Sequence, residues 1–192
     1  MIKLKNHYFV LRHGETNWGH SDICYPFDNK TSVVLSEQGI SQIKLVGESL
    51  KKEKIDLIFC SDYLRTKQTA EIVAKALNLK IIADIRLGDT DIGDYYGTPK
   101  KEFYNEFPNP IQRFETKSPK NGESWNNVKK RLSAFLEEIE AKYQGKNILI
   151  IGHGDSLWLF DGLIQESTNQ ELIDIIFKKK EYIKKGELRK IN

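Results

Sequence analysis

The sequence has few of the residues that build disulfide frameworks and no run long enough to span a membrane. Among 192 residues only Cys24 and Cys60 are cysteines, and their spacing matches no metal-binding or redox motif. No apolar run approaches the roughly 20 residues that a transmembrane helix needs, and residues 1–6 lack the apolar core of a secretory signal. These absences argue against a secreted, disulfide-stapled or membrane-bound protein, and they favour the cytoplasm.

A large excess of charge of one sign is also missing. Lys and Arg number 30 against 27 for Asp and Glu, a net charge of +3, which does not indicate nucleic acid as a partner. We interpret the lysines of 178–185 as a solvated face. A hydrophobic content of 39% is typical of a globular chain. Because no repeat, linker or low-complexity segment interrupts it, we expect one domain over residues 1–192, and the sequence does not indicate an oligomeric state.

Apolar runs of strand length alternate with helical patterns along the chain. The patterns predict strands at 8–11, 55–60, 81–83 and 147–152. They predict helices at 36–50, 61–77, 124–144 and 156–163, and a further helix that passes through Leu172 and ends at Phe177. Two more short strands are expected near 182–183 and 188–189, on either side of Lys185-Gly186. This alternation predicts an α/β protein with a mainly parallel sheet covered by helices on both faces.

Two segments have weaker patterns. Residues 17–34 are rich in Asp, Asn and Ser and are expected to form an ordered loop. Residues 98–121 contain four prolines and several aromatic residues, for which we expect one short helix and a lid-like connection. Lys100, Lys101 and Arg113 of this segment are candidates for attracting an anionic substrate. Phe103, Tyr104 and Phe107 could pack on the body of that substrate, but they are more simply interpreted as anchors to the core.

Two histidines follow predicted buried strands. His13 comes after Tyr8-Phe9-Val10-Leu11-Arg12, and His153 comes after Ile148-Leu149-Ile150-Ile151-Gly152. Ligands of parallel α/β sheets gather at the carboxyl ends of the strands, so neighbouring strands would bring both histidines to one crevice. Arg65, in the first turn of the helix after the second strand, is expected at the same edge.

Such a cluster is strongly positive and suits a phosphoryl group. Arginine forks bind phosphate oxygens bidentately, and the N–H groups of a helix N-terminus, here at Gly154, add donors. The chain has no glycine loop of the P-loop type, and no spacing of His or carboxylates indicates a metal. The combination predicts phosphoryl transfer with a histidine nucleophile.

The motifs resemble the histidine phosphatase superfamily, which includes the cofactor-dependent phosphoglycerate mutases. Arg12-His13-Gly14-Glu15 matches its signature, with His13 at the phosphorylated position. The resemblance continues in order along the chain, through 61–70, 87–97, Gly122-Glu123-Ser124 and His153-Gly154. It implies a three-layer α/β/α sandwich and a phosphatase without metal or dissociable cofactor.

The resemblance also implies roles. His13 would attack phosphorus as the neutral ring, with a backbone carbonyl fixing its tautomer. Arg12, Arg65 and His153 would hold the phosphate oxygens. Asp89 would protonate the leaving oxygen and then activate water, which requires a raised pKa.

Two positions depart from the family's pattern. Asp89 is one methylene shorter than the Glu that is usual there, so Asp91, Asp155 and Glu123 remain alternative acids. Gly19 stands where many members have an Asn after the tryptophan. Substrate preference is therefore open.

We predict a phosphomonoester hydrolase that acts on a small phosphorylated metabolite. The alternatives are phosphoglycerate mutase-type transfer, a phosphohistidine protein phosphatase, and a catalytically weak module that binds phosphate or protein. The expected partner is the small phosphorylated substrate, with no nucleic acid and no membrane.

Overall fold

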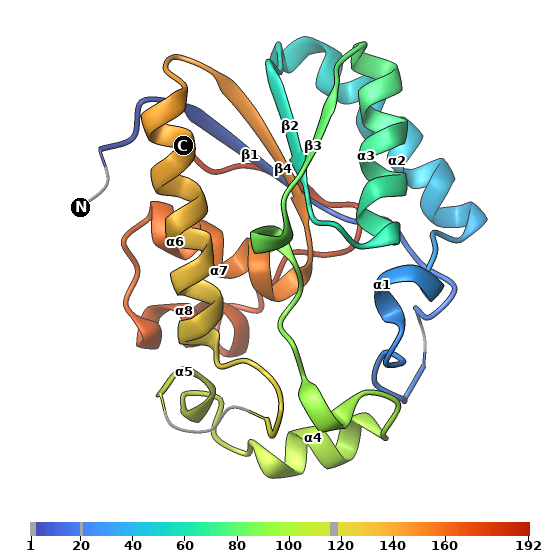
Figure 1. Cartoon of the computed structure of the whole chain (residues 1–192), viewed down its shortest axis with the longest axis vertical. Coiled ribbons are helices and arrows are strands. Elements are labelled where there is room, and N and C mark those ends of the chain that lie inside the picture. The colour runs from blue at the N-terminus through green and yellow to red at the C-terminus, as the bar shows by residue number, and fades with distance from the viewer. Residues whose placement is uncertain (1–2, 20, 116–118) are drawn as a thin grey trace.

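A five-stranded sheet lies at the centre of the computed structural model, which describes residues 3–19, 21–115 and 119–192 (Figure 1). The strands lie in the order β3-β2-β4-β1-β5. Their bounds are β1 (His7–Arg12), β2 (Leu57–Cys60), β3 (Ile81–Ala83), β4 (Asn147–Gly152) and β5 (Leu188–Lys190). Every pairing is parallel except that of β5 with β1. The predicted mainly parallel sheet is confirmed.

Helices cover both faces of the sheet. Successive strand residues point to opposite faces, so Tyr8 and Val10 of β1 pack with α6 and α7, whereas Phe9 and Leu11 pack with α2 and α3. Figure 1 shows these two helical layers on either side of the strands. The helices are α1 (Asn29–Ser32), α2 (Glu37–Leu50), α3 (Leu64–Leu77), α4 (Lys100–Glu106), α5 (Gln112–Glu115), α6 (Trp125–Lys142), α7 (Gly154–Ile164) and α8 (Asn169–Phe177). The three-layer α/β/α sandwich is therefore confirmed.

Local signals set several helix ends. The Ser36 and Ser124 hydroxyls accept hydrogen bonds from backbone N–H groups in the first turns of α2 and α6, as serine N-caps do. Asn78 closes α3 in the left-handed conformation, with φ of 54°. These three ends agree with the sequence.

Two helix starts differ from the prediction. The helix α3 begins at Leu64 with Tyr63 at its N-cap, and neither Ser61 nor Asp62 caps it. The Ser61 hydroxyl lies instead 2.9 Å from Nε2 of His153. Similarly, α7 begins at Gly154 and not at Ser156. The starts of these two helices therefore differ from those that the capping pattern predicts.

The strand predicted at Tyr182-Ile183 is wrong. This segment has no strand partner among the described residues, because its polar groups are used elsewhere. The Tyr182 hydroxyl donates to Asp155, and the Ile183 carbonyl accepts from the Arg12 guanidinium. Only the second predicted strand forms, as β5, and it pairs with β1.

The two weakly patterned segments contain more helix than expected. Short helix α1 lies within the loop predicted for 17–34. The 98–121 segment has two helices, α4 and α5, where one was predicted; residues 116–118 of that segment lie outside the described residues. Phe103 and Phe107 are buried beside Cys24 in a small cluster of their own, which supports the interpretation that they anchor the segment. Tyr104 is exposed and is no such anchor.

Three 3₁₀ turns complete the described elements, η1 (Lys51–Glu53), η2 (Ile85–Leu87) and η3 (Gly93–Tyr95). In the described part of the chain, we find no helix with the length and apolar content to cross a bilayer.

Candidate active site

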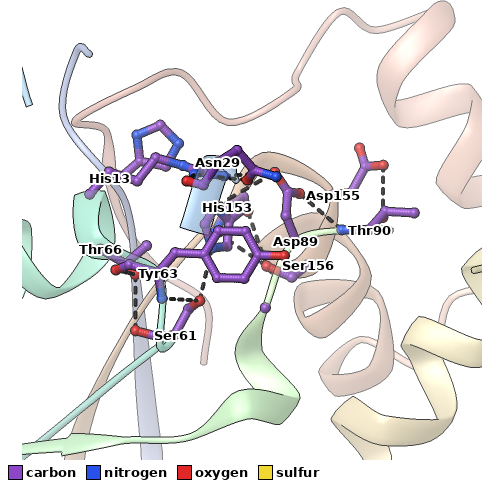
Figure 2. A network of polar contacts seen from close by, with 12 residues as sticks. His13, Asn29, Ser61, Tyr63, Thr66, Asp89, Thr90, His153, Asp155 and Ser156 are labelled. Atoms are coloured by element: carbon purple, nitrogen blue, oxygen red, sulfur yellow. Dashed lines mark hydrogen bonds and ion pairs between the residues drawn. The ribbon is translucent and has the colours of Figure 1, made fainter. Parts of the chain in front are cut away.

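His13 and His153 follow adjacent strands at the same level. Strands β1 and β4 are neighbours, with Arg12 opposite Gly152 in the register. The next residue in each chain is therefore a histidine, and the ring centroids are 5.5 Å apart. Figure 2 shows both rings in one polar network. The predicted convergence of the two histidines is confirmed.

The loop that carries His13 lies directly against helix α2. The Ser36 N–H donates to the Glu15 carbonyl (2.9 Å), and a Cβ on Gly39 would lie 2.1 Å from that same carbonyl oxygen. A Cβ on Gly14 would lie 2.9 Å from the Gly39 carbonyl oxygen. Because real Cβ atoms do not approach backbone this closely, the two glycines permit the contact that fixes the loop.

The tautomer of His13 is determined by its own loop. Its Nδ1 lies 2.8 Å from the Gly14 carbonyl oxygen, which can only accept, so Nδ1 carries the proton and Nε2 has the lone pair. Burial, followed by the charges of Arg65 and Arg12, holds the pKa of His13 well below its usual value. The ring is thus neutral near pH 7, as a nucleophile must be.

Arg65 is the largest fully buried side chain. Its guanidinium lies between the rings of Tyr25 and Tyr63, 4.6 and 4.8 Å from their centroids. It donates to the Asn29 carbonyl (3.0 Å) and lies 3.4 Å from Oδ2 of Asp89. Stacking and hydrogen bonds together fix the orientation of this cation.

Three buried nitrogens of the site have no hydrogen-bond partner within the described ranges: Arg12 Nε, Arg65 Nε and His153 Nδ1. Buried donors are nearly always satisfied in folded proteins. Three unpartnered nitrogens, from the end of β1, the first turn of α3 and the residue after β4, lie around a neutral histidine and indicate a site that takes an anion with several oxygens.

Asp89 is the best placed of the candidate acids. Its Oδ2 lies 3.4 Å from Arg65 and 3.6 Å from Nδ1 of His153. Burial raises the pKa of Asp89, Arg65 lowers it, and the charge of Asp155 raises it again; the net shift is upward. A carboxyl group with a raised pKa can carry a proton to a leaving oxygen.

The three alternative acids are engaged elsewhere. Asp91 accepts from the Gly93 N–H in a turn (2.8 Å), and Glu123 pairs with Arg131 (3.0 Å). Burial raises the pKa of Asp155, but Arg113 and three hydrogen bonds outweigh burial and lower it. A lowered pKa keeps Asp155 ionised, which makes it a poorer proton donor than Asp89.

Arg131 supports the segment that carries Asp89. It donates to the carbonyls of Gly88 (3.0 Å) and Asp89 (2.9 Å), and its other contacts are to Glu123 and the Arg86 carbonyl. Arg131 could not be predicted from the sequence, because an arginine inside a long helix has no local pattern that distinguishes it from a surface charge.

A cavity of about 190 Å³ opens beside these groups. Gly154 lines it, as do Arg12 and Asp89. Of the other lining residues, Lys100, Arg113, Phe103, Tyr104 and the alternative acid Asp155 were candidates from the sequence. The residues that the sequence did not indicate are Cys24, Tyr25, Asn29, Thr90, Ile92, Tyr96 and Tyr182. Most come from loops, where no periodicity indicates which side chains turn inward.

The cations of the 98–121 segment differ from the expectation. Arg113 pairs with Asp155 (3.2 Å) and stacks on Trp125, 3.8 Å from the ring centroid, so it is neutralised inside the protein. The ammonium of Lys100 donates to the Ser21 carbonyl. Lys101 is exposed.

No group of three His, Cys, Asp or Glu side chains within the described residues is arranged to hold a metal ion. The chemistry of the donor set is that of an anion site, with two arginines and two neutral histidines. The site residues present therefore fit a phosphoryl group better than a divalent cation.

The model of the histidine phosphatase superfamily (branch 1) matches residues 8–178 of the chain. Among curated proteins, phosphoserine phosphatase 1 of Hydrogenobacter thermophilus is 29% identical over 157 residues, covering 80% of this chain and 71% of the relative. The uncharacterized phosphatase PhoE of Bacillus subtilis is 31% identical over 148 residues, covering 77% of this chain and 72% of the relative.

Solved structures share the fold. A protein described as mycobacterial hydrolase 1 superimposes with a TM-score of 0.80 at 21% identity, over 95% of this chain and 86% of that one. YhfR of Bacillus stearothermophilus superimposes with a TM-score of 0.79 at 23% identity, over 95% of this chain and 89% of that one. With the sheet, the paired histidines and the matched residues in agreement, the chain belongs to branch 1 of the histidine phosphatase superfamily.

Proposed function

We propose that this protein is a metal-independent phosphomonoesterase that works through a phosphohistidine on His13 and acts on a small phosphorylated metabolite. The observation that carries the proposal is the set of unpartnered donors on Arg12, Arg65 and His153 around a neutral His13. The family membership and the relatives named as phosphatases support it.

In the first step, Nε2 of His13 attacks phosphorus and the bond to the ester oxygen breaks. Asp89 gives its proton to that oxygen, so the leaving group departs as an alcohol. Arg12, Arg65 and His153 hold the three non-bridging oxygens and stabilise their charge in the transition state.

In the second step, water attacks the phosphohistidine. Asp89, now ionised, takes the proton of that water, and the bond between phosphorus and Nε2 breaks. Inorganic phosphate leaves with His13 neutral again. The Gly14 carbonyl keeps the same Nδ1–H throughout, so the ring does not need to change its tautomer.

The substrate class rests on the cavity. A volume of about 190 Å³, lined by Arg12, Asp89 and Gly154, suits a small molecule better than a protein segment. Mutase-type transfer is the second candidate, because phosphoglycerate mutase-like protein 4 of Arabidopsis thaliana is 31% identical over 159 residues, covering 76% of this chain and 65% of that protein. Cys24 and Cys60 are both unbridged and buried, which supports a cytoplasmic location.

The test is a screen of purified protein against sugar phosphates, nucleotides, phosphoglycerates and phosphopeptides, with chelator present. We expect release of inorganic phosphate from small esters and an acid-labile phosphoenzyme. Transfer to a second hydroxyl without release of phosphate would favour the mutase. Loss of all activity in chelator would contradict the metal-free mechanism.

A further inference from the structure

The Asp155 carboxylate joins four separate segments of the chain. Its Oδ2 accepts from the Thr90 hydroxyl (3.1 Å), the Arg113 guanidinium (3.2 Å) and the Trp125 indole N–H (2.8 Å). Its Oδ1 accepts from the Tyr182 hydroxyl at 2.7 Å. These donors come from the loop after Asp89, from α5, from α6 and from the segment before β5.

One of these contacts leads directly to the proposed proton donor. The Thr90 hydroxyl donates to Asp155, and the Thr90 backbone N–H donates to Oδ1 of Asp89 at 3.1 Å. Figure 2 shows both contacts, with one dashed line from Thr90 to each carboxylate. With Oδ1 held by Thr90, the other oxygen of Asp89 faces Arg65 and His153.

The close approach of Tyr182 depends on the residue before Asp155. A Cβ on Gly154 would lie 2.1 Å from the Tyr182 hydroxyl oxygen. Gly154 therefore gives Tyr182 access to Asp155, and α7 presents this carboxylate in its first turn, where the helix dipole favours a negative charge.

We propose that Asp155 is a positioning residue for the reaction. Through Thr90 it orients Asp89 for proton transfer to the leaving oxygen, and through Arg113 it holds α5 over the same cavity. This inference rests on the proposed phosphatase function. Asp155 itself exchanges no proton with the substrate in this scheme, because four protein donors stabilise its ionised form.

A merely structural role for Asp155 makes a different prediction. It would slow every substrate equally through loss of folded protein. A positioning role affects the step in which Asp89 donates its proton, so the loss depends on how much protonation the leaving group needs. A series of substituted phenyl phosphates, from nitrophenyl to phenyl, measures this dependence.

The variants are Asp155→Asn, Thr90→Val and Thr90→Ser. Thr90→Val keeps the shape but removes the hydroxyl, whereas Thr90→Ser restores it. General acids contribute about 10²- to 10⁴-fold, so we expect kcat for phenyl phosphate to fall about 30-fold in Asp155→Asn and about tenfold in Thr90→Val. Nitrophenyl phosphate should lose less than about threefold in either, and Thr90→Ser should stay within about twofold of the wild type.

The pH profile separates the two variants. Groups that face Asp89 are the charged Arg12, Arg65 and Asp155 and the titratable His153, Tyr25, Tyr63, Tyr96 and Tyr182. Of these charges, only Asp155 is negative; Arg131, which donates to the Asp89 carbonyl, is paired with Glu123 and is not affected by either variant. Asp155→Asn removes this negative charge and leaves Arg113 unneutralised, so the pKa of Asp89 should fall. The pH above which kcat for phenyl phosphate declines should therefore be lower than in the wild type. Thr90→Val changes no charge, so the pH of this decline should be the same as in the wild type.

Asp174→Asn, at an exposed pair with Lys178 on α8, is the matched control and should change nothing. Equal losses for nitrophenyl and phenyl phosphate, or failure of Thr90→Ser to restore the rate, would overturn the positioning role. If Asp155→Asn does not fold, the Thr90 pair still decides the question. Failure of the wild type to hydrolyse any ester would instead contradict the proposed function, so the two failures are distinguishable.

Discussion

The active site has two halves that are held in different ways. The strand-end half consists of Arg12, His13, Arg65, Asp89 and His153. Arg12 ends β1, the two histidines follow strands, Arg65 lies in the first turn of α3, and Asp89 follows the turn η2. The covering half consists of Tyr25, Tyr96, Arg113 and Tyr182, which come from loops and short helices. The first half is fixed by backbone register and close packing, and the second by side-chain bonds, several of them to Asp155. We therefore expect changes in the strand-end half to lower kcat and changes in the covering half to raise KM.

The largest effect should follow from removing the nucleophile. In His13→Ala the attacking nitrogen is gone, so turnover should fall by at least about a thousandfold and no acid-labile phosphoenzyme should form. His7→Ala, an exposed histidine on the same strand, is the control. Radiolabelled substrate followed by acid treatment checks the outcome. Acid-labile labelling of the variant would show that another residue is the nucleophile.

Arg65→Lys tests whether the strand-end half needs a fixed fork and not only a charge. Lysine keeps the positive charge but loses the stacking between Tyr25 and Tyr63 and the paired donors. Loss of one oriented transition-state donor costs about 10²- to 10³-fold, so we expect kcat to fall by that factor. Steady-state kinetics with nitrophenyl phosphate measures it. A change confined to KM would show that Arg65 only binds the ground state.

The pH dependence of stability should also distinguish the halves. Burial and the neighbouring arginines hold the pKa values of His13 and His153 well below 6.5. Below about pH 6.5 the unfolded chain binds protons that the folded protein does not, so stability falls as pH falls.

Each histidine should contribute a slope of up to about 1.4 kcal/mol per pH unit. Urea unfolding between pH 7.5 and 5 measures the slope, and His13→Gln should reduce it. Tyr96 of the covering half, whose pKa burial raises to about 12, stays neutral in this window, so Tyr96→Phe should leave the slope unchanged. A slope that is identical in His13→Gln would show that this ring does not stay neutral.

Arg113→Ala should act on the covering half. Asp155 loses its cationic partner, and α5 loses its stacking on Trp125. We expect KM to rise about three- to tenfold while kcat for nitrophenyl phosphate changes less, since uniform binding is lost. A fall in kcat without a change in KM would place Arg113 with the catalytic groups.

The smallest effect should come from Tyr182→Phe, which removes one hydrogen bond to Asp155 (2.7 Å). A buried hydrogen bond to a charged group contributes about 1.5–3 kcal/mol, and partial exposure of Asp155 places this one near the lower end. Thermal unfolding measures the loss. Turnover should remain within about twofold, and a larger loss would assign Tyr182 to the reaction itself.

The strand-end half was predictable because it follows from rules that act along the chain. An apolar run, then a histidine, repeats at His13 and His153, and parallel pairing of the two strands brings them together. Arg65 is found by the same reasoning at the start of the next helix. Even the carbonyl that fixes the His13 tautomer was expected, since a buried neutral histidine needs one acceptor.

The covering half was not predictable, because no rule that acts along the chain determines it. Tyr182-Ile183 has high strand propensity, but contacts with Asp155 and Arg12 decide its conformation. Arg113 looks like a free cation in the sequence, and only the fold places it beside a buried carboxylate. Asn29, which accepts from Arg65, lies in a stretch whose pattern indicates only a loop. These contacts join residues far apart in the chain, and no local signal encodes them.

The contact between Gly39 and Glu15 has a consequence for how the protein tolerates mutation. Gly39 lies in helix α2, outside the cavity, yet the smallest side chain would push against the peptide that follows His13-Gly14. Alanine is normally the most favourable residue within a helix, so a screen based on helix propensity would select Gly39→Ala as a stabilising change. In this protein the same change should inactivate the enzyme, although Gly39 touches no substrate.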